Sequence, residues 1–273
     1  MLTIGVPTKG TSLSLIRVLE FCHELPSNFE ILISINPGDI GVEIPAIYLE
    51  ASNFKFIWQK VDLGLYGNFR FLLQSAENEL FCWFCVDDNV SKDISDICKH
   101  AVDTQSDLTI PSWQLDEYDM KSARYEGKPK FGELPDLTNI YTRVLASLNI
   151  DPSWMFGVWK TSYLKNIFPK ENFDWLDCDI LQEVLLNGKV SIFNSVNPAL
   201  IGTHYTFNRR PNAVNSRGHS PRIAIMKQLV RLPHYLKLGP LPLKLMIIRC
   251  WTLYHYSREL NRSLLKNRIK RSR

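Results

Sequence analysis

The sequence predicts an α/β protein with a mostly parallel sheet flanked by helices, followed by a basic helical extension. Three observations lead to this prediction. Short apolar segments alternate with segments of helical periodicity along the first half of the chain. Several apolar segments lack polar alternation, as strands that are buried on both faces require. The charge is divided between an acidic body, residues 1–208, and a basic tail, residues 209–273.

The first half of the chain gives the clearest elements. A strand is expected at Leu2 to Val6, where Pro7 ends the apolar run, and a helix follows whose apolar residues recur from Leu13 to Cys22. The elements expected next are a strand at 30–35, a strand at 54–58, a helix at 67–76 and a strand at 80–86. Strands that alternate with helices indicate parallel βαβ units.

The pattern weakens in the second half. Residues 112–137 are rich in Tyr, Lys, Gly and Pro, and they are expected to form a long loop that could lie over a site. The elements expected after it are a helix at 137–148, a helix at about 180–186, and two short strands at 190–193 and 199–201.

Composition places the chain among ordinary globular proteins, because its 273 residues are 45% hydrophobic and 22% charged. The start of the chain has no secretory signal pattern, and no run approaches the roughly 20 apolar residues of a spanning helix. A cytoplasmic protein is therefore expected. The six cysteines are dispersed, so free thiols are expected. Cys82 and Cys85 form a C-x-x-C pair that could serve metal or redox chemistry, although packing in the core is favoured.

Polar side chains follow the apolar strands, at the edge where ligands bind in parallel sheets. They include Thr8 and Lys9, then Asn36 and Asp39, and finally the run Asp87-Asp88-Asn89. Two adjacent carboxylates repel each other unless a cation neutralises them. Their oxygens suit Mg²⁺ or Mn²⁺, which can bridge the phosphates of a nucleotide diphosphate. Alternatively, this run is a polar turn that caps the next segment.

Three segments together resemble glycosyltransferase family 2, which has the Rossmann-like GT-A nucleotide-diphosphosugar fold. They are Ile4-Gly-Val-Pro-Thr, Leu63-Gly-Leu-Tyr-Gly-Asn-Phe-Arg, and Val86-Asp-Asp-Asn at the place of the family's DxD-type motif. The resemblance covers roughly residues 2–205. Val86 stands where the family often has an acid, and Asn89 replaces a possible third acid. Either Asp87 or Asp88 could therefore ligate the metal; Asp88 is favoured, with Asp87 in support.

The resemblance implies a donor site and a metal site. Asn36 stands where the family usually has an acid that reads the nucleotide base, and its amide offers both a donor and an acceptor. The implied donor-binding residues are Pro7, Thr8, Lys9, Asn36, Asp39, Asn68, Arg70 and Asp87. The implied cofactor is Mn²⁺ or Mg²⁺, and the implied ligands are Asp88, Asp87 and His204. His204 could instead be a packed, hydrogen-bonded side chain.

The resemblance also implies a catalytic base and an acceptor site. Asp177 stands at the family's base position, Asp179 is the second candidate and Asp174 the third. The alternative for Asp177 and Asp179 is to cap the helix expected at about residue 180. Trp154 and Gly157 lie in the segment where the family binds its acceptor. An aromatic face suits a sugar ring, but an aromatic residue in such a segment can equally belong to the core.

The tail differs from the rest of the chain in its charge. Residues 209–273 carry 16 Lys and Arg against one Glu, whereas residues 1–208 carry 16 Lys and Arg against 27 Asp and Glu. Apolar residues recur in the tail with helical spacing from Leu243 to Tyr254. Such a helix is expected to lie on an anionic membrane surface. One alternative is that the helix packs on the catalytic domain. Another is nucleic-acid binding, which the acidic charge of residues 1–208 disfavours.

The expected function is an inverting glycosyltransferase. It would move a sugar from a nucleotide-diphosphate sugar to a hydroxyl of a glycan or lipid-linked glycan, as in the synthesis of surface polysaccharide or lipopolysaccharide. No nucleic-acid partner is expected, and the protein would be peripheral on the inner face of the membrane. The alternatives are a catalytically silent scaffold that binds sugar nucleotides, and a nucleic-acid binder that acts through the tail.

Overall fold

The structure is a computed structural model, and the description covers part of the chain. It describes residues 1–86, 88, 91–119, 124–125, 130–131, 134–137, 139, 142–143, 146–147, 150–169, 176–196 and 198–203. Within this set, side chains are described except at residues 39–40, 115–119, 124–125, 130–131, 152, 176–178 and 199–203. The chain divides into one compact unit of residues 1–135 and 150–210 and a second of residues 136–149 and 211–273. Both sheets belong to the first unit.

The main sheet has seven strands in the order β10-β5-β9-β4-β1-β2-β3. Their bounds are β1 (Leu2–Thr11), β2 (Glu30–Ile40), β3 (Phe54–Trp58), β4 (Leu80–Trp83), β5 (Leu108–Pro111), β9 (Val158–Lys160) and β10 (Val190–Phe193). Only β9 is antiparallel to its neighbours, which are β4 and β5. The predicted mostly parallel sheet is confirmed.

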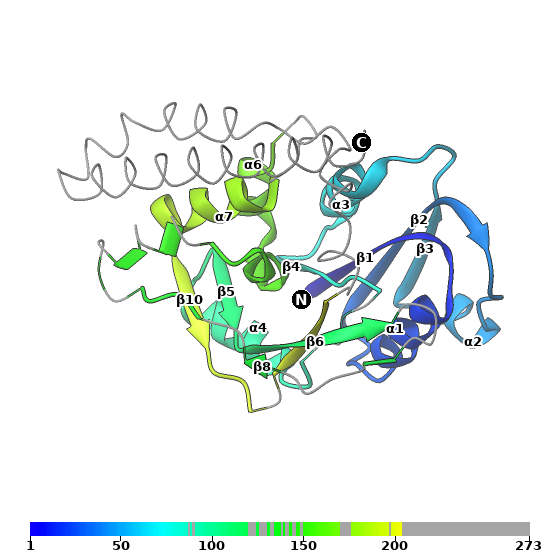
Figure 1. The fold of residues 1–273 in the computed structure, drawn as a ribbon, viewed down its shortest axis with the longest axis horizontal. Helices are drawn as coiled ribbons and strands as arrows, with labels where there is room; N and C mark the ends of the chain where they lie inside the picture. Colours follow the sequence, from blue (N-terminus) through cyan, green and yellow to red (C-terminus); the bar gives the residue numbers. More distant parts are fainter. Residues whose placement is uncertain are drawn as a thin grey trace, which may run out of the picture. The chain divides into compact units, whose positions relative to one another are not determined.

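Helices cover both faces of this sheet (Figure 1). One face carries α1 (Leu13–His23), α2 (Ala46–Leu49) and α4 (Ile94–Asp103), and the other carries α3 (Gly64–Ser75), α6 (Thr161–Ile167) and α7 (Leu176–Asn187). A short 3-10 helix, η1 (Pro152–Phe156), precedes β9. Because both faces are covered, the central strands are apolar throughout, which is why the sequence shows them as uninterrupted apolar runs.

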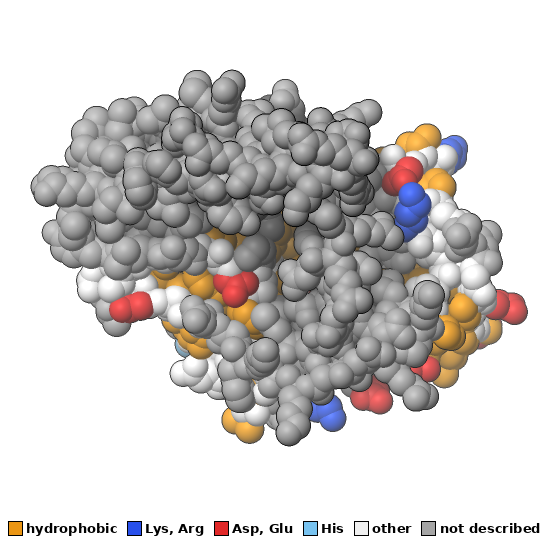
Figure 2. All heavy atoms as spheres, in the orientation of Figure 1, with side chains coloured by type: hydrophobic (Ala, Val, Ile, Leu, Met, Phe, Trp, Pro, Cys, Tyr) orange, Lys and Arg blue, Asp and Glu red, His pale blue; other side chains and the backbone are white. Residues whose placement is uncertain are grey.

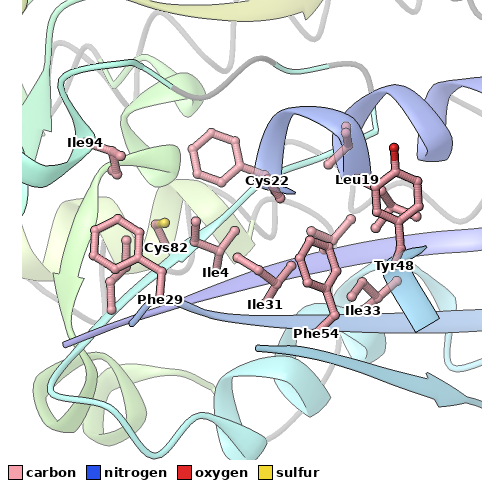
Figure 3. Packing of buried hydrophobic residues seen from close by; sticks show 14 of the residues in the cluster. Ile4, Leu19, Cys22, Phe29, Ile31, Ile33, Tyr48, Phe54, Cys82 and Ile94 are labelled. Atoms are coloured by element: carbon pink, nitrogen blue, oxygen red, sulfur yellow. The ribbon is translucent and has the colours of Figure 1, made fainter. Parts of the chain in front are cut away.

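The core lies mainly between the sheet and helix α1. Ile4 of β1 and Ile31 of β2 are fully buried there and pack in one cluster with Cys22 of α1 (Figure 3). Burying one such aliphatic side chain stabilises the fold by about 1.5–3 kcal/mol. On the opposite face, a Cβ on Gly5 would lie 2.9 Å from the Cζ atom of Phe81, so the close approach of this ring requires glycine.

A second sheet replaces the predicted loop at residues 112–137. It consists of β11 (Ala199–Thr203), β6 (Trp113–Asp119) and β7 (Arg124–Tyr125), and β8 (Lys130–Phe131) also pairs with β6. The loop prediction is therefore wrong. The strand β6 pairs in parallel with β11, which lies more than 80 residues further along the chain. Pairing with so distant a segment leaves no local signal in the sequence.

Other elements begin earlier than predicted or were not predicted. Helix α3 starts at Gly64 instead of residue 67, and α7 starts at Leu176 instead of about residue 180. The elements α2, β5, η1, β9 and α6 were not predicted because they are short, and the ten-residue helix α4 was missed although its apolar residues recur with helical spacing. The described residues of the predicted helix at 137–148 that are helical are Thr142, Arg143, Ala146 and Ser147.

A few apolar residues are exposed on the described surface, and the thiols of Cys22 and Cys82 are buried in the core. Figure 2 shows apolar side chains near the edge where α2 lies, and Ile47 and Leu49 of this helix are exposed. Cys82 is buried in the core cluster and its thiol is free, as predicted. Burial raises the pKa of the Cys22 thiol to about 12. In the part of the chain that the structure describes, no helix has the length and apolarity to cross a membrane.

Candidate functional site

The topology of the main sheet defines where a ligand is expected. The chain runs from β1 outwards to β2 and β3, and α3 then leads back across to β4 on the other side of β1. The connections therefore change direction between β1 and β4. In open α/β sheets, ligands bind in the crevice outside the carboxyl ends of the strands at such a switch point. Most of the candidate donor residues that the structure describes lie near this edge.

Asn68 of α3 bonds to both β1 and β2. Its Nδ2 atom donates to the carbonyl oxygen of Ser34 at 3.0 Å and to that of Thr8 at 3.4 Å. These two acceptors fix the orientation of the amide, because the reverse orientation would set its oxygen against two carbonyls. The side chain is 2% exposed, and its Oδ1 atom has no hydrogen-bond partner among the described residues. Asn68 therefore ties α3 to β1 and β2.

Asn36 lies within β2, which continues to Ile40, and bonds to the turn that opens α3. Its Oδ1 atom accepts from the backbone N–H of Leu63 at 3.3 Å, and its Nδ2 atom donates to the carbonyl of Gly64 at 3.4 Å. Gly64 has a φ of +67°, a left-handed conformation that favours glycine. The Asn36 amide is thus engaged with backbone groups beside the crevice, and it positions the first turn of α3.

Lys9 and Asp62 connect β1 with the same turn. The Nζ atom of Lys9 lies 2.8 Å from Oδ2 of Asp62, and the backbone N–H of Gly64 donates to Oδ1 of Asp62 at 2.9 Å. The hydrogen bond from Lys9, followed by that from Gly64, lowers the pKa of the Asp62 carboxyl. Both side chains are largely exposed, with relative accessibilities of 66% and 42%. Solvent screening therefore makes this a weak link that a ligand phosphate could compete for.

The acidic residue Asp88 lies in a turn directly after β4. Its backbone N–H donates to the carbonyl of Cys85 at 3.0 Å, and its Oδ2 atom accepts from the N–H of Cys85 at 3.0 Å. Its side chain is 4% exposed. This double closure makes a compact turn at the carboxyl edge beside β1.

Of the predicted metal ligands, the described residues include only Asp88. A carboxylate oxygen is a ligand that Mg²⁺ and Mn²⁺ accept, and Asp88 contributes one at the expected edge of the sheet. Among the side chains that the structure describes, no group of three or more His, Cys, Asp or Glu residues could hold a metal ion. The other two predicted ligands, Asp87 and His204, lie outside the described residues. The chemistry of Asp88 fits the predicted metal, and Asp88 is the one predicted ligand that can be located.

Arg70 contacts the segment that follows α6. Its Nη2 atom donates to the carbonyl of Pro169 at 2.8 Å, and its guanidinium carbon lies 5.9 Å from the centroid of the Phe168 ring. The Phe168 ring in turn lies 5.9 Å from the ring of Trp83 on β4. Arg70 therefore connects α3 with the end of α6, and the structure places its charge beside that segment.

On the predicted acceptor side, Trp154 and Gly157 are packed. Trp154 is 3% exposed. A Cβ on Gly157 would lie 2.6 Å from the carbonyl oxygen of Thr109, so the tight approach of two backbones requires glycine there. Asp177 and Asp179 belong to the first turn of α7, which begins at Leu176, so neither is the residue that precedes the helix. The side chain of Asp179 is half-buried.

Several predicted residues lie wholly or partly outside the described part of the chain. The side chains of Asp39 and Asp177, and all of Asp174 and of the tail, lie outside the described residues. Three residues at the site were not predicted, namely Arg17, Asp62 and Gly64. Asp62-Leu-Gly64 has the Asp-x-Gly pattern of a tight turn, which could have identified it. Arg17 lies on a helix between apolar residues, and nothing in its local sequence distinguishes it.

Solved structures provide the comparison. Neither a protein-family model nor a curated protein sequence is detectably similar to the chain. The fold matches residues 1–349 of S. aureus TarS in complex with UDP-GlcNAc, with a TM-score of 0.60 and 16% identity over 86% of this chain and 66% of that one. It matches the same TarS fragment with a TM-score of 0.53 and 21% identity over 74% and 60% of the two chains. The complex of this fragment with UDP gives a TM-score of 0.54 at 19% identity.

These matches establish the fold class. The chain has a GT-A nucleotide-sugar transferase fold, as the sequence resemblance predicted. It spans about three fifths of the length of the TarS fragment. At these identities the likeness concerns the fold.

Proposed function

We propose that the protein is an inverting glycosyltransferase that takes its sugar from a nucleotide-diphosphate donor. One observation carries this proposal: Thr8, Lys9, Asn36 and Asn68 are linked to one another or to one turn at the carboxyl edge of a GT-A sheet, and Asp88 follows the neighbouring strand. TarS, which has this fold, has been solved with UDP-GlcNAc and with UDP. A uridine diphosphate donor is therefore the first to test.

The donor diphosphate would lie at the switch point between β1 and β4. Lys9 would exchange its partner Asp62 for a phosphate oxygen of the donor, since their ion pair is exposed and therefore weak. Asp88, with Asp87, would hold Mn²⁺ or Mg²⁺, and His204 would complete the set of ligands. When bound, the metal supplies positive charge to the leaving diphosphate. Asn36 and Asn68 keep the surrounding turns and strand ends in place.

The transfer itself needs one base. As the acceptor oxygen forms its bond to the anomeric carbon, the bond from that carbon to the diphosphate oxygen breaks and the electron pair leaves with the diphosphate. A carboxylate takes the proton of the acceptor hydroxyl, and we assign this role to Asp177, with Asp179 as the alternative. Both belong to the first turn of α7. Trp154 and Gly157 belong to the proposed acceptor side, and no covalent enzyme intermediate is required.

The test is the hydrolysis of UDP-GlcNAc to UDP and GlcNAc, with water as the acceptor, in the presence of Mn²⁺, measured for the full chain and two variants. Replacing the base, as in Asp177→Asn, should lower turnover by about 100-fold to 10,000-fold and leave UDP affinity unchanged. Asp179→Asn is the matched variant, two residues further along α7. If Asp179→Asn loses turnover and Asp177→Asn does not, Asp179 is the base. If the wild-type chain binds UDP-GlcNAc and never releases UDP, the protein is a silent scaffold.

The tail belongs to the proposal as a membrane contact. Residues 209–273 combine a strong positive charge with an apolar stripe, which suits an anionic membrane on the cytoplasmic side and a lipid-linked acceptor there. Deleting residues 240–273 should release the protein from anionic vesicles in a sedimentation assay and leave UDP binding intact. Sedimentation of the truncated chain with the vesicles would contradict this role. Salt-sensitive binding to DNA, without vesicle binding, would favour the nucleic-acid alternative.

A further inference from the structure

The turn that carries Asp88 has an anchor that comes from the other side of the crevice. Arg17 lies in α1, the helix that follows β1 and that Ser12 caps by accepting from the N–H of Leu15. Its Nη2 atom donates to the carbonyl of Val86 at 3.0 Å and to the carbonyl of Asp88 at 3.0 Å. One nitrogen thus bridges two carbonyls of the turn after β4.

This contact joins the two strands that border the switch point. Strand β1 provides Thr8 and Lys9 and continues directly into α1, whereas β4 continues into the turn at Cys85 to Asp88. Without Arg17, the turn is closed by the two hydrogen bonds between Cys85 and Asp88. Those bonds shape the turn internally, and the N–H of Phe84, just before the turn, donates to the carbonyl of Gly5 in β1 at 2.9 Å. Arg17 ties the turn to the β1–α1 unit.

The chemistry of the side chain suits this task. A guanidinium is planar, always charged, and holds its N–H donors in a fixed arrangement, so both carbonyls are bound in one geometry. A lysine ammonium can also donate to two carbonyls, but it is a point charge on a flexible stem, so it would keep only part of this fixed arrangement. The guanidinium of Arg17 also brings a positive charge next to the backbone of the acidic residue Asp88.

We propose that Arg17 is a positioning residue for the donor site: it fixes the acidic turn so that Asp88 is held ready for the cation that accompanies the nucleotide diphosphate. This assignment rests on the proposed function. Groups that orient a metal ligand without touching the metal typically change metal affinity by about 10-fold to 100-fold when they are replaced. The effect of Arg17 should therefore be found in the part of nucleotide affinity that depends on the metal.

The experiment measures UDP affinity of the full chain by calorimetry, with and without Mn²⁺, together with the melting temperature. The variants are Arg17→Met and Arg17→Lys. The matched control is Lys165→Met, because the Lys165 ammonium also bridges two carbonyls, those of Gln74 at 3.3 Å and Ala76 at 2.7 Å. These lie at the end of α3, away from the acidic turn.

The readout is the factor by which Mn²⁺ strengthens UDP binding. Arg17→Met should reduce this factor by about 10-fold or more, Arg17→Lys should reduce it less, and Lys165→Met should leave it within about threefold of wild type. If Arg17→Met does not fold, Arg17→Lys decides. A factor that stays at the wild-type value, with a melting temperature lowered as in Lys165→Met, would show a purely structural role and overturn the proposal. If the wild-type chain fails to bind UDP, the proposed function is at fault, and the role of Arg17 falls with it.

Discussion

Replacing Asn68 by aspartate exchanges the NH₂ group of the amide for a carboxylate oxygen, which removes the donor, adds a negative charge and keeps the shape of the side chain. In the wild type the Asn68 amide donates to the carbonyls of Ser34 and Thr8 and is 2% exposed. A carboxylate at this place would face two carbonyl oxygens with no donor between them. Such a buried, unpaired charge costs several kcal/mol, so the carboxyl would take up a proton instead.

Protonation sets the upper limit of the cost. Because the unfolded aspartate has a pKa of about 3.9, keeping it protonated costs about 5 kcal/mol at about pH 7.5 and about 1.5 kcal/mol at about pH 5. The folded pKa of this carboxyl would lie above the unfolded value. The stability of the variant is therefore greatest at low pH and is lost as the pH rises towards the folded pKa. At low pH the neutral acid can still donate one hydrogen bond to Ser34.

Thermal unfolding followed by circular dichroism at both pH values tests this. With about 2–4 °C per kcal/mol for a domain of this size, Asn68→Asp should melt about 10–20 °C below wild type at about pH 7.5 and about 3–6 °C below it at about pH 5. Asn53→Asp is the control, because the half-buried Asn53 donates to a single carbonyl, that of Phe29. It should stay within about 1 kcal/mol of wild type. A variant as stable as wild type at the higher pH, or a deficit that does not shrink on acidification, would refute the assigned hydrogen bonds.

Three further predictions follow from other contacts. Lys9→Met removes the main cause of the lowered pKa of Asp62, so the carboxyl should titrate at higher pH in the variant, and an unchanged titration by NMR would contradict the pair. Gly157→Ala should destabilise the fold by about 1–3 kcal/mol in denaturant unfolding, because the new Cβ would lie 2.6 Å from a carbonyl oxygen; full stability would show that the backbone can move. Burial raises the pKa of Cys22 and of Cys98 to about 12, so both thiols should resist alkylation at neutral pH, and rapid alkylation of the folded chain would contradict this. The free energy of unfolding should also fall as the pH rises above about 9, because only the unfolded thiols ionise there.

The sequence predicted the strands that are buried on both faces, because their apolar runs need no partner to be recognised. The segments at β1, β2 and β4 are of this kind, and their polar ends led to Thr8, Asn36 and Asp88. It failed where structure depends on distant pairing. Strand β6 is one example, since its partner β11 lies far along the chain and the composition of residues 112–137, rich in Tyr, Lys, Gly and Pro, predicts a loop.

The roles of site residues were harder to predict than their positions. Asn36 and Arg70 were assigned to the donor from the resemblance, yet the structure engages their side chains with the turn at Gly64 and with Pro169. Arg17 was not identified at all, because a single arginine on a helix gives no sign of the loop that it will contact after folding. Such contacts arise from tertiary packing, which a one-dimensional pattern does not contain.

The account depends above all on a nucleotide diphosphate that binds at the switch point between β1 and β4. Calorimetric titration of the full chain with UDP in the presence of Mn²⁺, for wild type and Asp88→Asn, tests this most directly. The account predicts saturable binding by wild type and at least about 10-fold weaker binding by Asp88→Asn, since an amide is a poorer ligand than a carboxylate for a hard cation. Equal affinity of the two proteins, or no binding by wild type, would contradict it.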